Sequence, residues 1–294
     1  MMNFFSNLFG YILNAIYMLV KNYGVAIILF SVLVKLLMLP LSIKQQKTMK
    51  KNEKIQKEMK ILQTKHKGNP EMLNQEVMEL YKREKINPFG GCFSIIIQFI
   101  LLISMFYLVR SPLTYMKKID KTAIDAKITQ IQEENEEQGI NKTYPEISII
   151  KNIQENNLTE DEMYINMNFL GLDLSQIPQE NYQDFKVFII PVLYVISSVI
   201  SIKITSLTSN KLEEKPKEES TDLIKQEDKD EMDQAEMTAQ MNKTMTWMMP
   251  ILAVSISLVA PLGLALYWLL NNIIMIIERL FLNKFFSREE EKNA

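Results

Sequence analysis

Two residue types that often do chemistry are almost missing from this chain of 294 residues, which has one cysteine and one histidine. The single cysteine, Cys92, excludes an intrachain disulfide. The single histidine, His66, excludes a histidine-based catalytic triad and a metal site built from several histidines. Glycine-rich phosphate-binding motifs and the HExxH metal motif are also absent. We therefore expect no covalent catalysis, no cofactor and no bound metal.

A strong net charge is missing as well, because the formal charge is only −2, and this balance gives no reason to expect a nucleic-acid partner. The near-neutral average conceals long apolar runs separated by charged segments. Five apolar stretches are long enough, or nearly so, to cross a bilayer. The sequence predicts an all-α integral membrane protein with spans at residues 23–43, 88–110, 185–206, 244–260 and 262–282, the last two forming a tight hairpin.

Acidic residues are absent from the apolar core of these stretches, yet the first one carries a cation, Lys35, near its middle. A lysine at that depth costs about 3 kcal/mol on insertion-derived scales. Such a residue usually faces a water-filled cavity or a partner, which makes Lys35 the first functional candidate. Snorkelling of the ammonium group to the nearer interface is the alternative.

Other polar residues lie inside the predicted spans, and several are spaced four apart, which places them on one helix face. We expect them to line a common hydrophilic groove that attracts acidic groups of a ligand. The alternative is that each one bonds within its own helix or joins two helices. The candidate groove residues are Ser31, Lys35, Ser94, Gln98, Tyr194, Ser198, Ser201, Trp268, Asn271 and Asn272.

Charge in the connecting segments predicts the topology. The segment Lys44–Lys85 holds eleven lysines and one arginine against six glutamates, whereas residues 111–184 are strongly acidic. The positive-inside rule places the first segment in the cytoplasm and the second outside, with the N-terminus outside and the C-terminus inside. The remaining segments are then a loop at 207–243 and a tail at 283–294 in the cytoplasm. Residues 1–22 lack the features of a cleavable signal peptide and predict an amphipathic helix in the outer interface.

The basic segment at 44–87 predicts a helical hairpin. Apolar residues recur at helical spacing on both sides of a turn that contains Gly68, Asn69 and Pro70, and Pro70 suits the first position of the second helix. Residues 111–184 are rich in polar residues and predict a partly helical or loose segment.

Two motifs resemble a known family. The stretch LYKREKINPFGGCFSIIIQ ends at Gln98 and enters the second span, and PLGLALYW ends at Trp268 in the last one. Both resemble signatures of the YidC/Oxa/Alb family of membrane protein insertases, as does YGVAIILFSVLVKLLMLPLSIKQQKTMKK around the first span. Residues 111–167 and 208–241 carry no such likeness.

The resemblance implies five helices around a groove that opens to the cytoplasm and to lipid and is closed toward the outside. It implies that Lys35, where most bacterial members carry arginine, contacts hydrophilic segments of incoming substrates. It further implies that the hairpin recruits substrate and that the clients are nascent membrane proteins. A ribosome and a Sec translocon are candidate further partners, and the sequence leaves both open. The expected location is the bacterial plasma membrane. A small-anion transporter or channel is the alternative function, and a membrane-anchored scaffold is a third reading.

Overall fold

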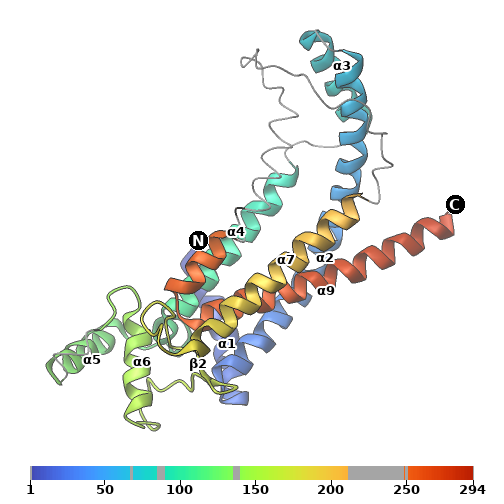
Figure 1. The fold of residues 1–294 in the computed structure, drawn as a ribbon. Helices are drawn as coiled ribbons and strands as arrows, with labels where there is room; N and C mark the ends of the chain where they lie inside the picture. The colour runs from blue at the N-terminus through green and yellow to red at the C-terminus, as the bar shows by residue number, and fades with distance from the viewer. Residues whose placement is uncertain are drawn as a thin grey trace. The chain divides into compact units, whose positions relative to one another are not determined.

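The computed structural model describes residues 2–66, 69–84, 90–134, 140–210, 248 and 251–293 (Figure 1). The chain is mostly helical and forms two compact units. One unit comprises Met1–Gln176 with Phe281–Ala294, and the other comprises Ile177–Leu280.

The first unit begins with two helices joined by a two-residue turn. Helix α1 spans Met2–Val20 and α2 spans Tyr23–Lys65. The turn contains Lys21 in a left-handed conformation, and the side chain of Asn22 accepts a hydrogen bond from the backbone N–H of Val25 at 3.1 Å. This cap satisfies one of the free N–H groups at the start of α2. The rings of Phe9 and Phe30 are 5.7 Å apart, so α1 packs against the first turns of α2.

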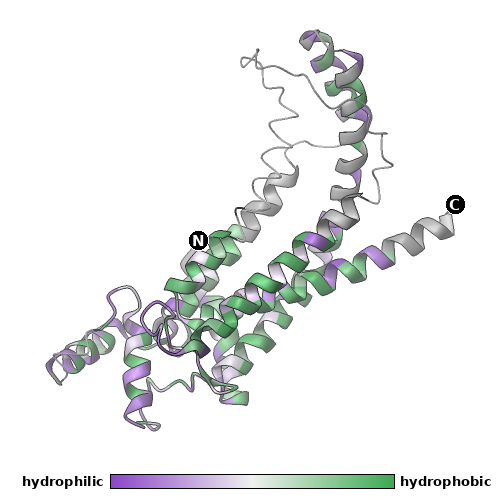
Figure 2. Cartoon of the chain, in the orientation of Figure 1, coloured by the Kyte–Doolittle hydropathy of each residue, from purple (hydrophilic) through white to green (hydrophobic). Residues whose placement is uncertain are grey.

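Helix α2 is longer than the predicted span, because it continues without a break through Pro40 to Lys65. The sequence placed a boundary at residue 43 because the composition changes there. That change marks the end of the apolar part and not the end of the helix. Figure 2 shows the apolar character of α1 and of the first part of α2. At 1.5 Å per residue the 43 residues of α2 extend for about 64 Å, about twice the thickness of a bilayer core.

Helices α3 and α4 complete the main helices of this unit. Helix α3 spans Pro70–Arg83, and α4 spans Gly90–Arg110 and continues into a short π-helix, η1, at Leu113–Lys117. Helix α1 packs closely on this region. Ser6 Oγ donates to the Ser104 carbonyl at 3.1 Å, and a Cβ atom on Gly10 would lie 1.9 Å from the Tyr115 carbonyl oxygen. Only glycine permits this approach of α1 to η1.

Residues 111–176, which we call the connecting subdomain, contain regular structure and a buried core. Helix α5 spans Lys121–Glu134, α6 spans Pro145–Glu155, and strands β1 (Asn168–Phe169) and β2 (Leu172–Asp173) form an antiparallel hairpin. The prediction of a loose segment was therefore wrong for the described part, and that of partial helix was right. Isoleucines on the buried face of α6 supply the core: Ile147, Ile149, Ile150 and Ile153.

The second unit contains a short 3-10 helix, η2, at Phe185–Phe188, helix α7 at Ile189–Asn210, a helix at 251–259, and α9 from Leu262. Helix α9 continues to Asn293 in the first unit. The backbone N–H of Gln179 donates to the Leu258 carbonyl at 3.0 Å, which ties the start of this unit to the helix at 251–259.

Three helical segments are long and apolar enough to cross a membrane in the described part of the chain: Tyr23–Thr48, Phe185–Ile204 and Leu262–Phe285. They coincide with three of the five predicted spans. The spans at 88–110 and 244–260 stay predictions. Helix α4 covers almost all of the span predicted at 88–110. The described residues of the span predicted at 244–260 include the helix at 251–259.

Candidate functional site

Lys35 lies within the apolar part of α2, twelve residues after its first residue, which corresponds to about 18 Å along the helix axis. Its side chain is half-buried. The most exposed leucines of this stretch, Leu29, Leu33, Leu36 and Leu37, form one stripe. At 100° per residue, Lys35 points about 140° away from the centre of that stripe. The lysine is therefore not on the face of α2 that exposes most leucine side chains.

Ser31 precedes Lys35 by one turn and shares its face. It is buried, and its Oγ donates to the Ile27 carbonyl at 2.7 Å. This bond within the helix satisfies the hydroxyl donor, which fits the alternative that each polar residue bonds within its own helix. The hydroxyl oxygen can still accept another hydrogen bond. Ser94 and Gln98 are both in α4, and their side chains lie outside the described part of the structure.

The second unit brings several of the other predicted residues together. Asn272 of α9 is buried and its Nδ2 donates to Ser197 Oγ and Ser198 Oγ of α7, both at 3.0 Å. Ser197 Oγ in turn donates to the Tyr194 carbonyl at 2.8 Å. These bonds connect two helices across an apolar interior. This cluster, which we call the asparagine clasp, fits the helix-joining alternative for Asn272 and Ser198.

The remaining candidates of the second unit lie near this clasp in sequence. Trp268 is one helical turn before Asn272 and is buried, whereas Asn271 and Ser201 are half-buried. Ser197 was not among the candidate groove residues. Its role as the link between Asn272 and the backbone of α7 depends on contact between helices and has no local sequence signal.

The basic segment forms an antiparallel pair of helices. Contacts pair Glu58 with Arg83, Met59 with Tyr81, and Lys65 with Glu76, so residue numbers rise along α2 as they fall along α3. Pro70 is the first residue of α3, the position that the sequence analysis expected for it. The side chain of Asn69 caps α3 by accepting from the Met72 N–H at 3.2 Å.

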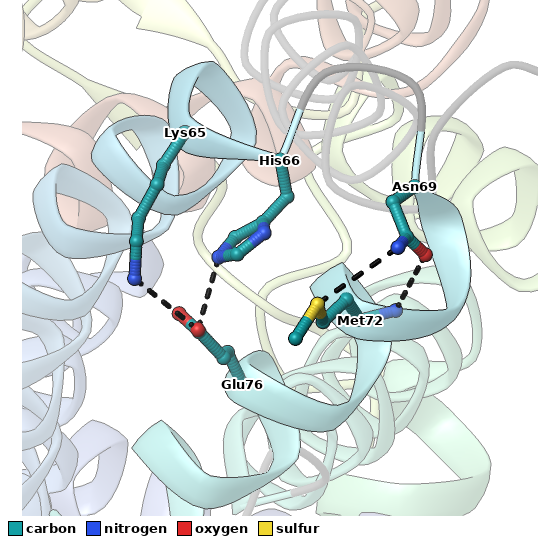
Figure 3. Close-up of polar contacts among 5 residues, drawn as sticks. All are labelled: Lys65, His66, Asn69, Met72 and Glu76. Atoms are coloured by element: carbon teal, nitrogen blue, oxygen red, sulfur yellow. Dashed lines mark hydrogen bonds and ion pairs between the residues drawn. The ribbon is translucent and has the colours of Figure 1, made fainter.

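The described end of this hairpin carries a small charged cluster (Figure 3). Lys65 Nζ is 3.3 Å and His66 Nε2 is 3.0 Å from Glu76 Oε1. Partial burial opposes ionisation of Glu76, but the hydrogen bonds and charges of Lys65 and His66 hold the pKa of this carboxyl below its usual value. Because the Glu76 side chain keeps 30% of its exposure to solvent, these ion pairs contribute little stability.

One buried carboxylate of the connecting subdomain was not identified from the sequence. Glu146 of α6 accepts hydrogen bonds at Oε2 from the backbone N–H groups of Leu113 and Thr114, at 2.7 and 3.0 Å, and at Oε1 from Thr114 Oγ1 at 2.6 Å. Burial raises the pKa of Glu146 although these bonds favour the ionised form. Glu146 therefore fixes α6 to the start of η1. The PE pair that opens α6 was the available signal, but its partner lies 32 residues away.

Within the described residues no three histidine, cysteine, aspartate or glutamate side chains form a group that could hold a metal ion. The described apolar helices α2, α7 and α9 carry a cation, Lys35, together with hydroxyl and amide side chains.

The comparisons with known proteins agree with the motifs in the sequence. A model of the family described as 60Kd inner membrane protein matches residues 15–290. A protein of Fusobacterium nucleatum subsp. nucleatum named Membrane protein insertase YidC is 38% identical over 109 residues, which cover 37% of this chain and 53% of that protein. Proteins of the same name from Francisella philomiragia subsp. philomiragia and Francisella tularensis subsp. novicida are 40% and 41% identical over 107 residues. Those matches cover 36% of this chain and 19% of each Francisella protein.

Proposed function

Because the chain belongs to the 60Kd inner membrane protein family, the YidC/Oxa family, we propose that it inserts nascent membrane proteins into the bacterial plasma membrane. The relatives that carry the insertase name are matched over about half of their length or less. Insertase activity is therefore a proposal for this chain. The observation that carries the proposal is the position of Lys35, midway along the apolar part of α2 and turned away from its stripe of exposed leucines.

The physical task of an insertase is to move a short polar segment of its client across an apolar barrier. A hydrated groove on the Lys35 face of α2 would shorten the path over which that segment is desolvated. The ammonium group would draw acidic client residues into the groove, because the attraction between opposite charges increases as the effective dielectric falls. The client's apolar helix would then leave sideways into lipid, where burial of apolar surface favours it.

The residues proposed to contact clients in the first unit are Ser31, Lys35, Ser94 and Gln98, and those in the second unit are Tyr194, Ser198, Ser201, Trp268, Asn271 and Asn272. Lys35 would bind acidic groups, and the amides and hydroxyls would replace water around the client backbone. The clasp supports a more specific division, in which Asn272 and Ser198 hold α7 to α9. Asn271 and Ser201, which are half-buried, would then be the members that contact clients.

The proposed topology places the N-terminus outside and the C-terminus in the cytoplasm. The hairpin of α2 and α3 would then stand in the cytoplasm, where it meets clients, ribosomes or a Sec translocon. Its exposed Ile61, Met72 and Met78 suit adaptable contacts with apolar segments. Because the hairpin's first arm is a continuation of the span, a client bound there would be connected to Lys35 by one continuous helix.

A charge exchange tests this function. Purified chain in liposomes is supplied with a single-span client whose translocated tail carries two aspartates, and insertion is measured as protease-protected tail. We expect Lys35→Arg to insert like the unaltered chain and Lys35→Glu to lose about tenfold, equivalent to about 1.4 kcal/mol. A tail carrying two lysines should reverse this order.

Leu36→Ala is the matched control, since Leu36 neighbours Lys35 but belongs to the exposed stripe. It should leave insertion unchanged. Equal insertion of both tails by all variants would refute the electrostatic mechanism while leaving the insertase activity intact. No insertion by the unaltered chain, together with chloride flux through the same liposomes, would favour the anion transporter.

A further inference from the structure

The β1–β2 hairpin ends in an apolar tip with an unusual backbone. Its two-residue loop is Leu170-Gly171, and both residues have positive φ, 51° and 78°. Glycine adopts this conformation freely, whereas a leucine there is strained. Leu170 is nevertheless 87% exposed, so packing against the described part of the chain compensates little for the strain or for the exposed apolar surface.

The base of this hairpin is attached to the start of α2. The backbone N–H of Tyr23 donates to the Asn166 carbonyl at 3.0 Å, and Asn22 Nδ2 donates to the Asn168 carbonyl at 2.6 Å. Phe169 packs on Gly24 so closely that a Cβ atom on that glycine would lie 2.4 Å from the ring. The hairpin is therefore fixed to the first turn of a helix that is apolar enough to cross a membrane from Tyr23 onward.

This attachment determines the depth of Leu170 once α2 crosses a bilayer. Leu170 follows Asn168 by two residues, so it lies within about 7 Å of the residue that binds Asn22. The end of α1 supplies two further exposed apolar side chains beside the same turn, Met18 and Leu19. All three positions belong to the first unit and adjoin the point at which the span begins.

We propose that the tip of the β1–β2 hairpin is a lipid anchor, with Leu170 inserted at the boundary between headgroups and acyl chains in the leaflet where α2 begins. This goes beyond insertase activity and depends only on α2 crossing the membrane. The anchor fixes the depth of the first turn of α2 and thereby the depth of Lys35. A protein partner is a poorer occupant, because a two-residue tip offers far less area than a stable protein interface needs.

The first test measures the surroundings of position 170 directly. In a Cys92→Ser background, Leu170→Cys is labelled with an environment-sensitive fluorophore and placed in phosphatidylcholine vesicles. We expect lipids with a nitroxide near the headgroup to quench this probe at least twice as strongly as aqueous iodide does. Leu158→Cys, at a leucine of the same subdomain that is 45% exposed and makes no hydrogen bond to α2 among those described, is the control and should favour iodide. Iodide quenching at position 170 equal to that of the free fluorophore would overturn the proposal.

The second test separates a lipid contact from a purely structural role. Asparagine tolerates the left-handed conformation, so Leu170→Asn relieves the backbone strain. If Leu170 contacts lipid, amide deuterium exchange at 166–173 in lipid nanodiscs should become several-fold faster in this variant. Unchanged or slower exchange would contradict the anchor, because relief of strain alone stabilises the hairpin.

Discussion

At the scale of single residues, Glu146 shows how one buried acid can hold two segments together. Its carboxylate accepts hydrogen bonds from the two backbone N–H groups that open η1 and from one hydroxyl. The penalty for leaving buried donors unpaired is larger than the net gain from each bond. Removal of the Glu146 carboxylate should therefore destabilise the fold mainly because it leaves these three donors without an acceptor.

Substitution of Glu146 should separate its charge from its hydrogen bonds. Glu146→Ala leaves three donors without acceptors and should cost about 3 kcal/mol. Glu146→Gln keeps an oxygen for the two N–H groups, and its amide can donate to Thr114 Oγ1, so it should match the unaltered chain at acidic pH, where Glu146 is protonated, and be at least as stable at higher pH. Thermal unfolding in detergent, followed by circular dichroism, measures both. A glutamine variant as unstable as the alanine variant would show that the charge itself is required.

The same residue predicts a pH dependence. Because burial raises the pKa of Glu146, the folded chain binds this proton more tightly than the unfolded chain does. The stabilising contribution is complete below the ordinary glutamate pKa and is lost as the pH rises through the raised pKa of the folded state. The difference in melting temperature between the unaltered chain and Glu146→Gln should therefore shrink as the pH falls. A difference that grows on acidification would contradict the assignment.

The asparagine clasp is also a residue-scale feature, and its neighbour provides the control. Asn272→Ala removes both bonds to α7 and should cost between about 0.6 and 1.7 kcal/mol, the average and the maximum found for polar contacts between membrane helices. Asn271→Ala should leave stability unchanged and reduce client insertion. Melting temperature and protected-tail yield, measured on both variants, distinguish the two roles. The reverse pattern would place Asn272 among the residues that contact clients.

At the scale of elements, the close approach of α1 to η1 depends on one glycine. On helix propensity alone, Gly10→Ala should stabilise α1 by about 1 kcal/mol. The new Cβ would instead meet the Tyr115 carbonyl at 1.9 Å, and such overpacking costs about 1–3 kcal/mol or more. We expect a lower melting temperature for Gly10→Ala. Ala15→Gly, at an exposed position of α1, should show only the loss from propensity. A higher melting temperature for Gly10→Ala would mean that α1 is not held against η1.

Elements differ in how far the sequence could predict them. The start of α3 was predictable because Asn69 and Pro70 act on the backbone within three residues. Helical periodicity placed Ser31 and Lys35 on one face of α2, and the role of that face as a groove stays a prediction. The continuation of α2 past residue 43 was missed because a change from apolar to basic residues alters the surroundings of a helix and not its hydrogen bonds.

At the scale of the whole molecule, the parts that sequence patterns missed are those made by distant contacts. The Asn166 carbonyl accepts a hydrogen bond from the Tyr23 N–H, and the Asn166 N–H donates to the Tyr17 hydroxyl oxygen at 2.9 Å. Both bonds join residues more than 140 positions apart in the sequence. No local pattern around residue 166 indicates such partners. The fold of the connecting subdomain follows from these contacts and from its isoleucines. Residues 111–167, where the sequence showed no family motif, lie within the stretch that the family model matches. The asparagine clasp likewise required two helices to meet.

The central claim is that a client passes along the Lys35 face of α2, and photocrosslinking tests it most directly. A photoreactive amino acid is placed at Ser31 or Leu39, one turn on either side of Lys35, and at Leu33 or Leu37 in the exposed stripe. A ribosome-bound client stalled during insertion is then irradiated. The account predicts crosslinks to the client from positions 31 and 39 and crosslinks mainly to lipid from 33 and 37. Client crosslinks from the leucine stripe alone would contradict it.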